Sequence, residues 1–525
     1  MAPVDIYTST SLVPVLTVIA HVVAVVWLTT LVGRTASRSY LTLPPSSDTR
    51  HREPLRKRHV RIFSYLALLS LAAGAFYSYK FGSLSYRIWA DERGIDLPSS
   101  FFGDSVAFRD GEHPGRLHPV RWLNDTTLYQ EVLEIVTGKS RYFWWGQQIT
   151  LSTVSWSNFV AIEGQRRKIT YLWAFMGLAQ LVNLSYAQNL FFVTLILTPV
   201  PLPANIRDLT RESVPITSSK LSQLKSKILL TKPEGWMPKP FINITILLAT
   251  YVSIFLVPFA SNTPSFMTVI TISKLLPFTP LMLPYLIPKS WGSVGSARQN
   301  YPSYATAFRA ISAISILLHM KSSTLALFYN TPSENYYSHT LLHPFNTEHR
   351  SALKRGSTAI ASIFGAVGEH PAVDAVGWDV LLTGLSLGAW AGIRGLDANN
   401  LLSLSFPFMP LPNAIVKAAA IASNTIKVEV QKPKSPLKRR PGRPKKDADN
   451  ASTVPPTPGR GRGRPKKYPF PEEAAYEPSD SSSVVEGDGD AEEDMEMAAF
   501  AWGLITVGGL GAGSAGVYGA EVLAR

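Results

Sequence analysis

The chain has 525 residues, of which 46% are apolar and only 17% are charged, and its net charge is +14 at pH 7. This composition argues against a string of water-soluble domains and predicts an integral membrane protein. The sequence has no cysteine, which excludes disulfides, thiolate metal sites and cysteine nucleophiles.

Nine apolar segments follow one another along the chain, each close to the roughly 20 residues that a helix needs to cross a bilayer. Lipid offers backbone N–H and C=O groups no partner, so each segment is predicted to be helical. The sequence therefore predicts an all-α fold, a polytopic transmembrane helical bundle of about 8 to 10 spans. The segments are 11–33, 62–82, 143–162, 169–198, 241–260, 266–287, 305–329, 373–393 and 498–522.

The first segment is predicted to be a retained membrane anchor, and eight Lys and Arg residues follow it between Arg34 and Arg61. Cytoplasmic loops are enriched in such residues, so this loop is predicted to be cytoplasmic. The next loop is then external, and its Asn124-Asp125-Thr126 is a potential glycan acceptor.

Strict alternation of nine spans places residues 199–240 outside, although this loop contains seven basic residues. Two interpretations address the conflict, although the first places Arg166, Arg167 and Lys168 on the opposite side from the other basic loops. Either the segment 143–162, which contains Gln147, Gln148 and Asn158, is re-entrant, or a further span lies near 401–423. The sequence leaves the side of the later charged loop open.

Small residues recur at every fourth position in two of the segments. They are Gly384, Gly388 and Gly392, and Gly508, Ala512 and Gly516. Such spacing allows helix backbones to approach closely. We expect these two segments to pack together within one chain, with homodimerisation as the alternative.

Residues 425–497 separate the multi-pass domain (1–424) from the last membrane helix (498–525), and their composition predicts a disordered loop. The part from 432 to 467 is basic. The part from 472 to 496 contains 11 acidic residues and no basic ones.

Two short motifs in the basic half, at 439–446 and 460–467, share the sequence Gly-Arg-Pro-Lys-Lys and resemble AT-hooks. The second has the Arg-Gly-Arg-Pro centre of that family, whereas Pro441 replaces the leading arginine of the first. The resemblance covers about 30 residues and implies that arginines enter the narrow minor groove of A·T-rich DNA while lysines reach phosphates. The implied DNA-binding residues are Arg440, Gly442, Arg443, Pro444, Lys445, Arg462, Gly463, Arg464, Pro465 and Lys466. Binding of anionic lipid through 432–467 is the alternative.

Polar residues inside the apolar segments are costly in lipid and therefore mark candidate sites. They either line a substrate cavity or join helices through hydrogen bonds. The candidates are Gln148, Asn158, Glu163, Gln180, Asn183, Lys274, His319 and Asp379, accompanied by Ser152, Ser155, Gln188 and Asn189. The sequence predicts no catalytic motif, metal site or cofactor.

The favoured function is a non-enzymatic membrane protein whose charged loop tethers A·T-rich DNA or chromatin to an endomembrane, either the endoplasmic reticulum or the nuclear envelope. The plasma membrane is the alternative location. The first rival function is a transporter with a polar site at the midplane, and the second is a lipid or isoprenoid enzyme that uses Glu163 or Asp379 as a general acid. The membrane core resembles uncharacterised multi-pass proteins of filamentous fungi, a resemblance that implies no function.

Overall fold

The chain is an all-α, multi-pass membrane protein, seen here in a computed structural model. The two AT-hook-like motifs lie outside the described residues, as does the predicted disordered loop up to residue 488. The described residues are 11–43, 53–95, 97, 117–198, 236–238, 240–294, 297–340, 343–410 and 489–524.

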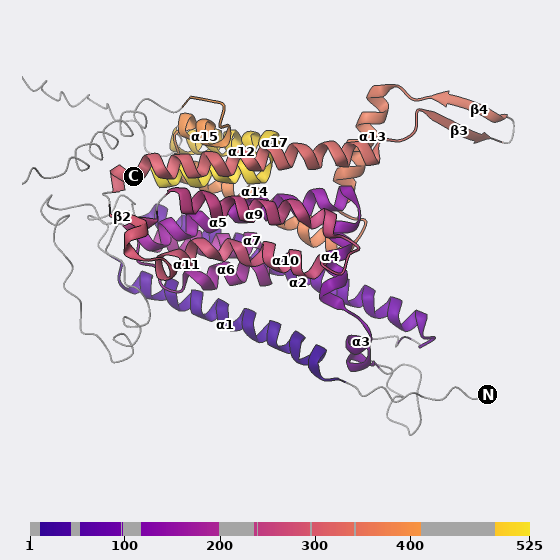
Figure 1. Cartoon of the computed structure of the whole chain (residues 1–525), viewed down its shortest axis with the longest axis horizontal. Coiled ribbons are helices and arrows are strands. Elements are labelled where there is room, and N and C mark those ends of the chain that lie inside the picture. The colour runs from indigo at the N-terminus through magenta and orange to yellow at the C-terminus, as the bar shows by residue number, and fades with distance from the viewer. Residues whose placement is uncertain are drawn as a thin grey trace, which may run out of the picture.

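The helices lie roughly side by side along one direction, with two small antiparallel sheets near opposite ends of the bundle (Figure 1). The longer helices are α1 (Val13–Leu41), α2 (Glu53–Glu92), α5 (Ser140–Arg166), α9 (Pro240–Ala260), α12 (Ala297–Asn330), α14 (Pro371–Arg394) and α17 (Gly489–Leu523). The shorter ones are α3 (Pro119–Asp125), α4 (Leu128–Gly138), α6 (Leu172–Leu181), α7 (Leu184–Leu197), α10 (Phe266–Leu275), η3 (Leu276–Phe278), α11 (Thr279–Leu286), η4 (Lys289–Trp291), α13 (Ala352–Gly365) and α15 (Ala398–Ser405). The strand β1 (Trp236–Pro238) pairs with β2 (Gly292–Val294), and β3 (Asn335–Thr340) pairs with β4 (His343–His349).

By length and composition, six helices of the described chain are long and apolar enough to cross a membrane. Two of them, α1 and α2, leave most of their apolar surface exposed, as expected of helices that face lipid. The helix α5 is too polar to belong to the six, yet it is largely buried in the centre of the bundle. Its polar residues therefore face protein, which is where a membrane protein tolerates them.

The segment 169–198 does not cross the bundle as one span. Its two halves, α6 and α7, meet at Val182 and Asn183, where the backbone leaves the helical conformation. The carbonyl of Thr198, just beyond α7, accepts a hydrogen bond from Arg167, which precedes α6. Because the end of α7 returns to the start of α6, the segment is a re-entrant hairpin, and the prediction of a crossing is corrected.

A second reversal divides α17, although its residues Met495–Leu523 meet the length and composition of a span. Gly509 has φ 79° and ψ 163°, which interrupts the helix. A Cβ built on Gly513 would lie 2.9 Å from the Cα of Ile505, whereas residues eight apart in a straight helix are separated by about 12 Å. The helix α17 is therefore a second hairpin, and it begins at Gly489 rather than at 498 as predicted.

The remaining seven segments of the described chain run from one end of the bundle to the other: α1, α2, α5, α9, α10 to α11, α12 and α14. Prolines at 277, 280 and 284 introduce the 3-10 turn η3 between α10 and α11 without reversing the chain. One end of the bundle, which we call the basic end, carries Arg166, Arg167 and Arg394. The other, which we call the acidic end, carries Ser140 and Pro371.

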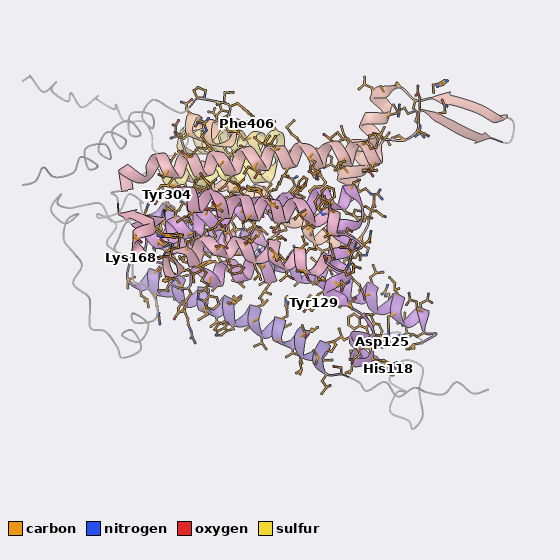
Figure 2. All side chains as sticks on the ribbon, in the orientation of Figure 1. His118, Asp125, Tyr129, Lys168, Tyr304 and Phe406 are labelled. Atoms are coloured by element: carbon orange, nitrogen blue, oxygen red, sulfur yellow. The ribbon has the colours of Figure 1, made fainter. Side chains whose placement is uncertain are left out.

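Both hairpins enter from the basic end. Figure 2 shows Lys168 and Tyr304 at this end, and His118, Asp125 and Tyr129 at the acidic end. The helix α5 is continuous, so the alternative that 143–162 is re-entrant is wrong, and the next segment along the chain is the re-entrant one. The alternative span near 401–423 contains only the short helix α15 within its described part.

When the two hairpins are treated as re-entrant, basic residues predominate in the connecting segments at one end of the bundle and acidic residues at the other. The segments that join helices at the basic end are 34–61, 164–171, 199–239 and 287–303, and they contain twenty Lys and Arg residues against five Asp and Glu. Those at the acidic end are 1–12, 83–139, 261–265 and 331–370, with nine basic and thirteen acidic residues. The positive-inside rule therefore predicts that the basic end faces the cytoplasm.

The glycine-spaced segments pack against each other, as predicted, because α14 and α17 form one of the most extensive helix contacts of the fold. The side chain of Trp502 lies against Gly388 and donates a hydrogen bond to the carbonyl of Gly384, with a donor–acceptor distance of 3.1 Å. Gly516 lies against Ser405 of α15. These glycines therefore serve packing within the chain, and they do not require a homodimer.

Candidate functional site

The tip of the hairpin α6–α7 is bound to a buried carboxylate. The backbone N–H groups of Leu184 and Ser185 donate to the two carboxylate oxygens of Asp379 on α14, at 3.0 and 2.8 Å. These N–H groups belong to the first turn of α7, which has no intrahelical partner for them. Asn183 caps the same turn through Tyr186 N and donates its amide to the carbonyl of Ser70 on α2, at 2.8 Å. The tip is thereby tied to both α14 and α2.

The tip of the α17 hairpin is bound to a neutral amide. The N–H of Leu510 donates to Oε1 of Gln148 on α5 at 3.0 Å, and Nε2 of the same glutamine lies 2.9 Å from Nδ1 of His319 on α12. Gly509 is pressed against both side chains, so that a Cβ at this position would lie 2.7 Å from the imidazole of His319. Below the tip, Ser514 and Ser155 of α5 are hydrogen bonded at 2.6 Å.

Both tips lie inside the membrane at a similar depth. Asp379 and Gln148 are each eight residues from the acidic-end start of their helices, or ~12 Å at 1.5 Å per residue. The return helix α7 has 14 residues and is therefore ~21 Å long, too short to cross a hydrocarbon core of about 30 Å. Two half-helices thus begin beyond the midplane and return to the basic end.

Several buried polar atoms on the helices around the two hairpins have no hydrogen-bond partner within the described chain. Gln188 of α7 is fully buried with both amide atoms unpaired. Its neighbours Phe191 and Phe192 contact Phe159 of α5 and Trp390 of α14, so Gln188 faces the interior between α5 and α14. Further buried atoms without a partner on α5, α7, α14 and α17 are Ser152 Oγ, Trp156 Nε1, Asn189 Oδ1, Trp390 Nε1 and Tyr518 OH.

A cluster of ion pairs closes this interior at the basic end. Glu163 and Glu521 are completely buried and pair with three arginines. Arg394 binds both carboxylate oxygens of Glu521 at 2.9 Å. Arg167 donates to Glu163 at 3.1 Å and to the carbonyl of Leu195 at the end of α7, and Arg166 reaches the carbonyl of Val522 at the end of α17. The cluster therefore joins the ends of both hairpins to each other at the basic end of the bundle.

The structure brings most of the predicted intramembrane candidates into these three places and leaves three outside. Gln148 and His319 lie at one tip, Asn183 and Asp379 at the other, and Glu163 in the ion-pair cluster. By contrast, Asn158 donates to the carbonyl of Val154 in its own helix, Gln180 is half-buried on α6, and Lys274 is exposed on α10.

Glu521, Arg394 and Gly509 complete the arrangement and were not predicted from the sequence. Glu521 is the one acidic residue between 497 and 525, which is a signal that could have identified it. Arg394 is the last residue of α14, just beyond the predicted segment 373–393, where a basic residue is common. Gly509 was hidden by its neighbour Gly508, which was assigned to packing.

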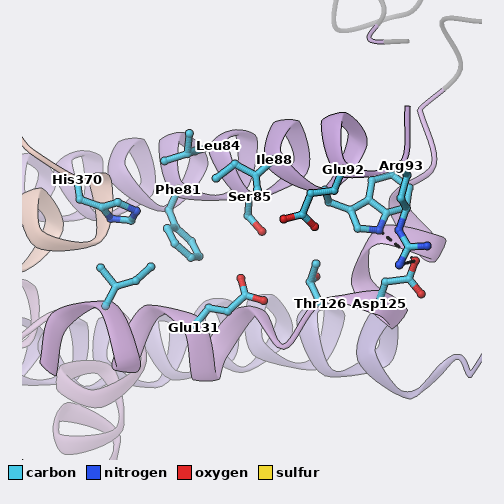
Figure 3. Close-up of a pocket in the computed structure, with 12 residues that line it drawn as sticks. Phe81, Leu84, Ser85, Ile88, Glu92, Arg93, Asp125, Thr126, Glu131 and His370 are labelled. Carbon is cyan, nitrogen blue, oxygen red and sulfur yellow. Dashed lines mark hydrogen bonds and ion pairs between the residues drawn. The ribbon is translucent and has the colours of Figure 1, made fainter. Parts of the chain in front are cut away.

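A separate cleft of about 320 Å³ lies near the acidic end, between α2 and the helices α3 and α4 (Figure 3). Glu92 and Glu131 point toward one another across it. Asp125 at its edge accepts a hydrogen bond from the indole of Trp89 and pairs with Arg93, both at 3.0 Å. No described contact links this cleft to the hairpin tips.

Comparison with known proteins identifies no relative of the chain: no protein-family model, curated protein or solved structure matches it. Within the part of the chain that the structure describes, no group of three or more His, Asp or Glu residues is placed to hold a metal ion. The two hairpins and the buried polar groups that hold them are therefore the features that bear on function.

Proposed function

We propose that the membrane domain transports a small solute, and that the two hairpins form the part of the domain that binds it. The observation that supports this proposal is the pair of half-helices that begin inside the membrane at Asp379 and at Gln148. Discontinuous helices are common at the binding sites of transporters. Their ends place helix dipoles inside the membrane, whereas a helix that crosses the bilayer without a break has its ends at the surface.

The environment of the buried carboxylates favours transport over catalysis. A general acid must be able to exchange its proton with a substrate, whereas Glu163 is enclosed by Arg166 and Arg167 at 2.6 and 3.1 Å. Both oxygens of Asp379 accept backbone N–H groups. Neither carboxylate presents an unengaged oxygen toward a cavity, so the enzyme alternative loses its two proposed acids.

Reconstitution into liposomes tests the transport proposal. Purified protein in lipid vesicles is expected to pass at least one of a panel of small solutes, both uncharged and ionic, faster than empty vesicles do. Gln148→Leu removes the acceptor at the α17 tip and is expected to slow that flux, whereas Gln165→Leu changes an exposed glutamine of the same helix and is expected to leave it unchanged. Equal flux through empty and protein-containing vesicles for the whole panel would reject transport.

We further propose that the segment 432–467 binds A·T-rich DNA through its AT-hook-like motifs, with Arg462 and Arg464 entering the minor groove. The described chain favours this proposal because α15 precedes residues 411–488 and α17 follows them at the basic end, which the charge distribution assigns to the cytoplasm. A DNA-binding segment requires that side of an endoplasmic reticulum or nuclear envelope membrane.

Two measurements test DNA binding. The full chain in lipid nanodiscs is expected to bind an A·T-rich duplex more tightly than a G·C-rich one, and the double change Arg462→Ala with Arg464→Ala is expected to remove the difference. A glycosylation acceptor introduced near residue 450 is expected to remain unmodified, whereas Asn124 at the opposite end is available for modification. Equal affinity for both duplexes, or a glycan at residue 450, would contradict the proposal.

A further inference from the structure

Lys274 lies well inside the membrane-spanning part of the chain. The helices α10 and α11 belong to one segment, Phe266–Leu286, which is long and apolar enough to cross a bilayer. Lys274 is eight residues, or ~12 Å, from the acidic-end start of this segment. Lysines that extend to the membrane interface usually lie near a helix end, whereas Lys274 is more than two helical turns inside.

Three other ionisable side chains at a comparable depth have contacts within the protein. Asp379 accepts two backbone N–H groups, and His319 is hydrogen bonded to the amide of α5 at the hairpin tip. The ammonium of Lys321 on α12 lies over two phenylalanine rings of α9, 3.7 and 4.6 Å from their centroids. By contrast, Lys274 has no hydrogen bond, ion pair or cation–π contact with any described residue.

The surface beside Lys274 has the composition of a helix-packing face. Thr268, Thr271, Ile272 and Leu275 follow the i, i+3, i+4, i+7 spacing of one helix face, and all four are exposed together with Lys274. Threonine is enriched where membrane helices pack, because it is small and its hydroxyl can form a hydrogen bond to a neighbouring helix. The buried side of α10 packs against α9, so this exposed face is not used within the described chain.

An ammonium that lacks a partner is costly in hydrocarbon, and ionisable residues inside membrane spans almost always face protein or water and pair with another polar group. We infer that a transmembrane helix of another protein packs on this face and places an Asp or Glu carboxylate beside Lys274. A carboxylate complements the charge of the ammonium, and close packing over Thr268 and Thr271 excludes lipid from the pair. This inference is independent of the transport and DNA-binding proposals.

A second copy of the chain does not offer such a carboxylate from its described part. Asp379, which lies at the depth of Lys274, is buried and holds the start of α7. Asp374, Glu163 and Glu521 lie near the ends of the bundle, and each is buried and already engaged by the protein. The partner is therefore a different protein, whose helix has an acidic residue ~12 Å inside the membrane.

Disulfide trapping in lipid nanodiscs tests the inference, because the chain has no cysteine of its own. The full chain with Thr271→Cys is combined with a synthetic leucine-rich transmembrane peptide that has one Glu about 12 Å from its end and one Cys a turn away. A second peptide has Leu in place of Glu. The Glu peptide is expected to cross-link about tenfold faster than the Leu peptide.

The matched control for position is Val22→Cys on α1, which is exposed nine residues from the acidic-end start of its helix. It is expected to show no preference between the two peptides, because no lysine lies on α1.

Changes at Lys274 test the charge itself. Lys274→Leu, made together with Thr271→Cys, is expected to reduce the rate for the Glu peptide to that for the Leu peptide. Lys321→Leu is the matched control, because this lysine already has aromatic partners, and it is expected to leave the preference unchanged. Leucine is favourable at a lipid-exposed position, so Lys274→Leu is expected to retain the Tm of the parent chain, which separates lost binding from misfolding.

A charge exchange completes the test. Lys274→Glu, combined with a peptide that carries Lys in place of Glu, is expected to restore cross-linking. Equal rates for the Glu and Leu peptides at Thr271→Cys would overturn the inference, and so would a preference that persists in Lys274→Leu. The same preference at Val22→Cys would also overturn it, because the Glu peptide would then have no specific face on this protein.

Discussion

The two re-entrant hairpins perform the same structural task with different chemistry. The α6–α7 hairpin turns without glycine, and its tip is held by a charged side chain from α14 and by the cap residue Asn183. The α17 hairpin turns at Gly509, and its tip is held by a neutral amide. Both tips therefore depend on an acceptor from another helix, but only the second also depends on a backbone conformation that requires glycine.

The largest loss of stability is expected from a change in the ion-pair cluster, where the two hairpins meet. Glu521→Leu leaves Arg394 buried without its bidentate partner and also removes the carboxylate 3.6 Å from Arg167, which binds the end of α7. Breaking a buried ion pair typically costs about 3–5 kcal/mol. Thermal unfolding of the purified variant in detergent should show this loss, and adding Arg394→Met should recover part of it. A wild-type Tm would show that the cluster does not join the hairpins.

A smaller loss is expected at the first tip. Asp379→Leu leaves the buried N–H groups of Leu184 and Ser185 without an acceptor, which corresponds to roughly 2–4 kcal/mol. Asp379→Asn retains one acceptor oxygen and should lose less. Protection of α7 amides from hydrogen exchange should fall in the leucine variant while protection of α17 remains. Equal loss in both hairpins would contradict their separate modes of support.

The second tip should respond to backbone changes instead. Gly509→Ala introduces a side chain at a backbone conformation that only glycine adopts readily, at about 1–3 kcal/mol, and places it against His319. Gly503→Ala is the matched control, because no atom lies within 4 Å of its added Cβ and alanine favours a helix. The control should be neutral or stabilising in the same unfolding assay. A neutral Gly509→Ala would show that the reversal is not fixed by this residue.

The smallest change in stability is expected outside both hairpins, at the acidic end. Hydrogen bonds from Arg141 and Tyr142 lower the pKa of Glu369, so this carboxylate stabilises the fold above its ordinary pKa, and the contribution is lost as pH falls through the lowered value. The two side chains are about a third exposed, which limits the free energy that this ion pair contributes to stability. The Tm of Glu369→Gln should fall less on acidification than that of wild type, and parallel pH profiles would exclude this role.

The sequence predicted the membrane class, the helical bundle and the packing of α14 on α17, because apolar length and small-residue spacing report these features directly. It also placed Gln148, Asn183, His319 and Asp379 among the candidates, since polar residues inside lipid-length segments must face protein. Apolar composition alone could not show that a segment reverses. The excess of basic residues in 199–239 indicated that one segment does not cross the membrane. The re-entrant segment was expected at 143–162, whereas it is 169–198.

Asp379 lies 195 residues downstream of the N–H group that it binds at Leu184. During translation the first hairpin is therefore complete long before its acceptor exists, and contacts this distant in sequence form slowly. Until α14 arrives, the tip must remain at the bilayer surface or be shielded by the insertion machinery, because an open helix start is expensive in lipid. Biogenesis of this protein should accordingly include a late docking step, and chains interrupted before α14 should be preferred targets of membrane quality control.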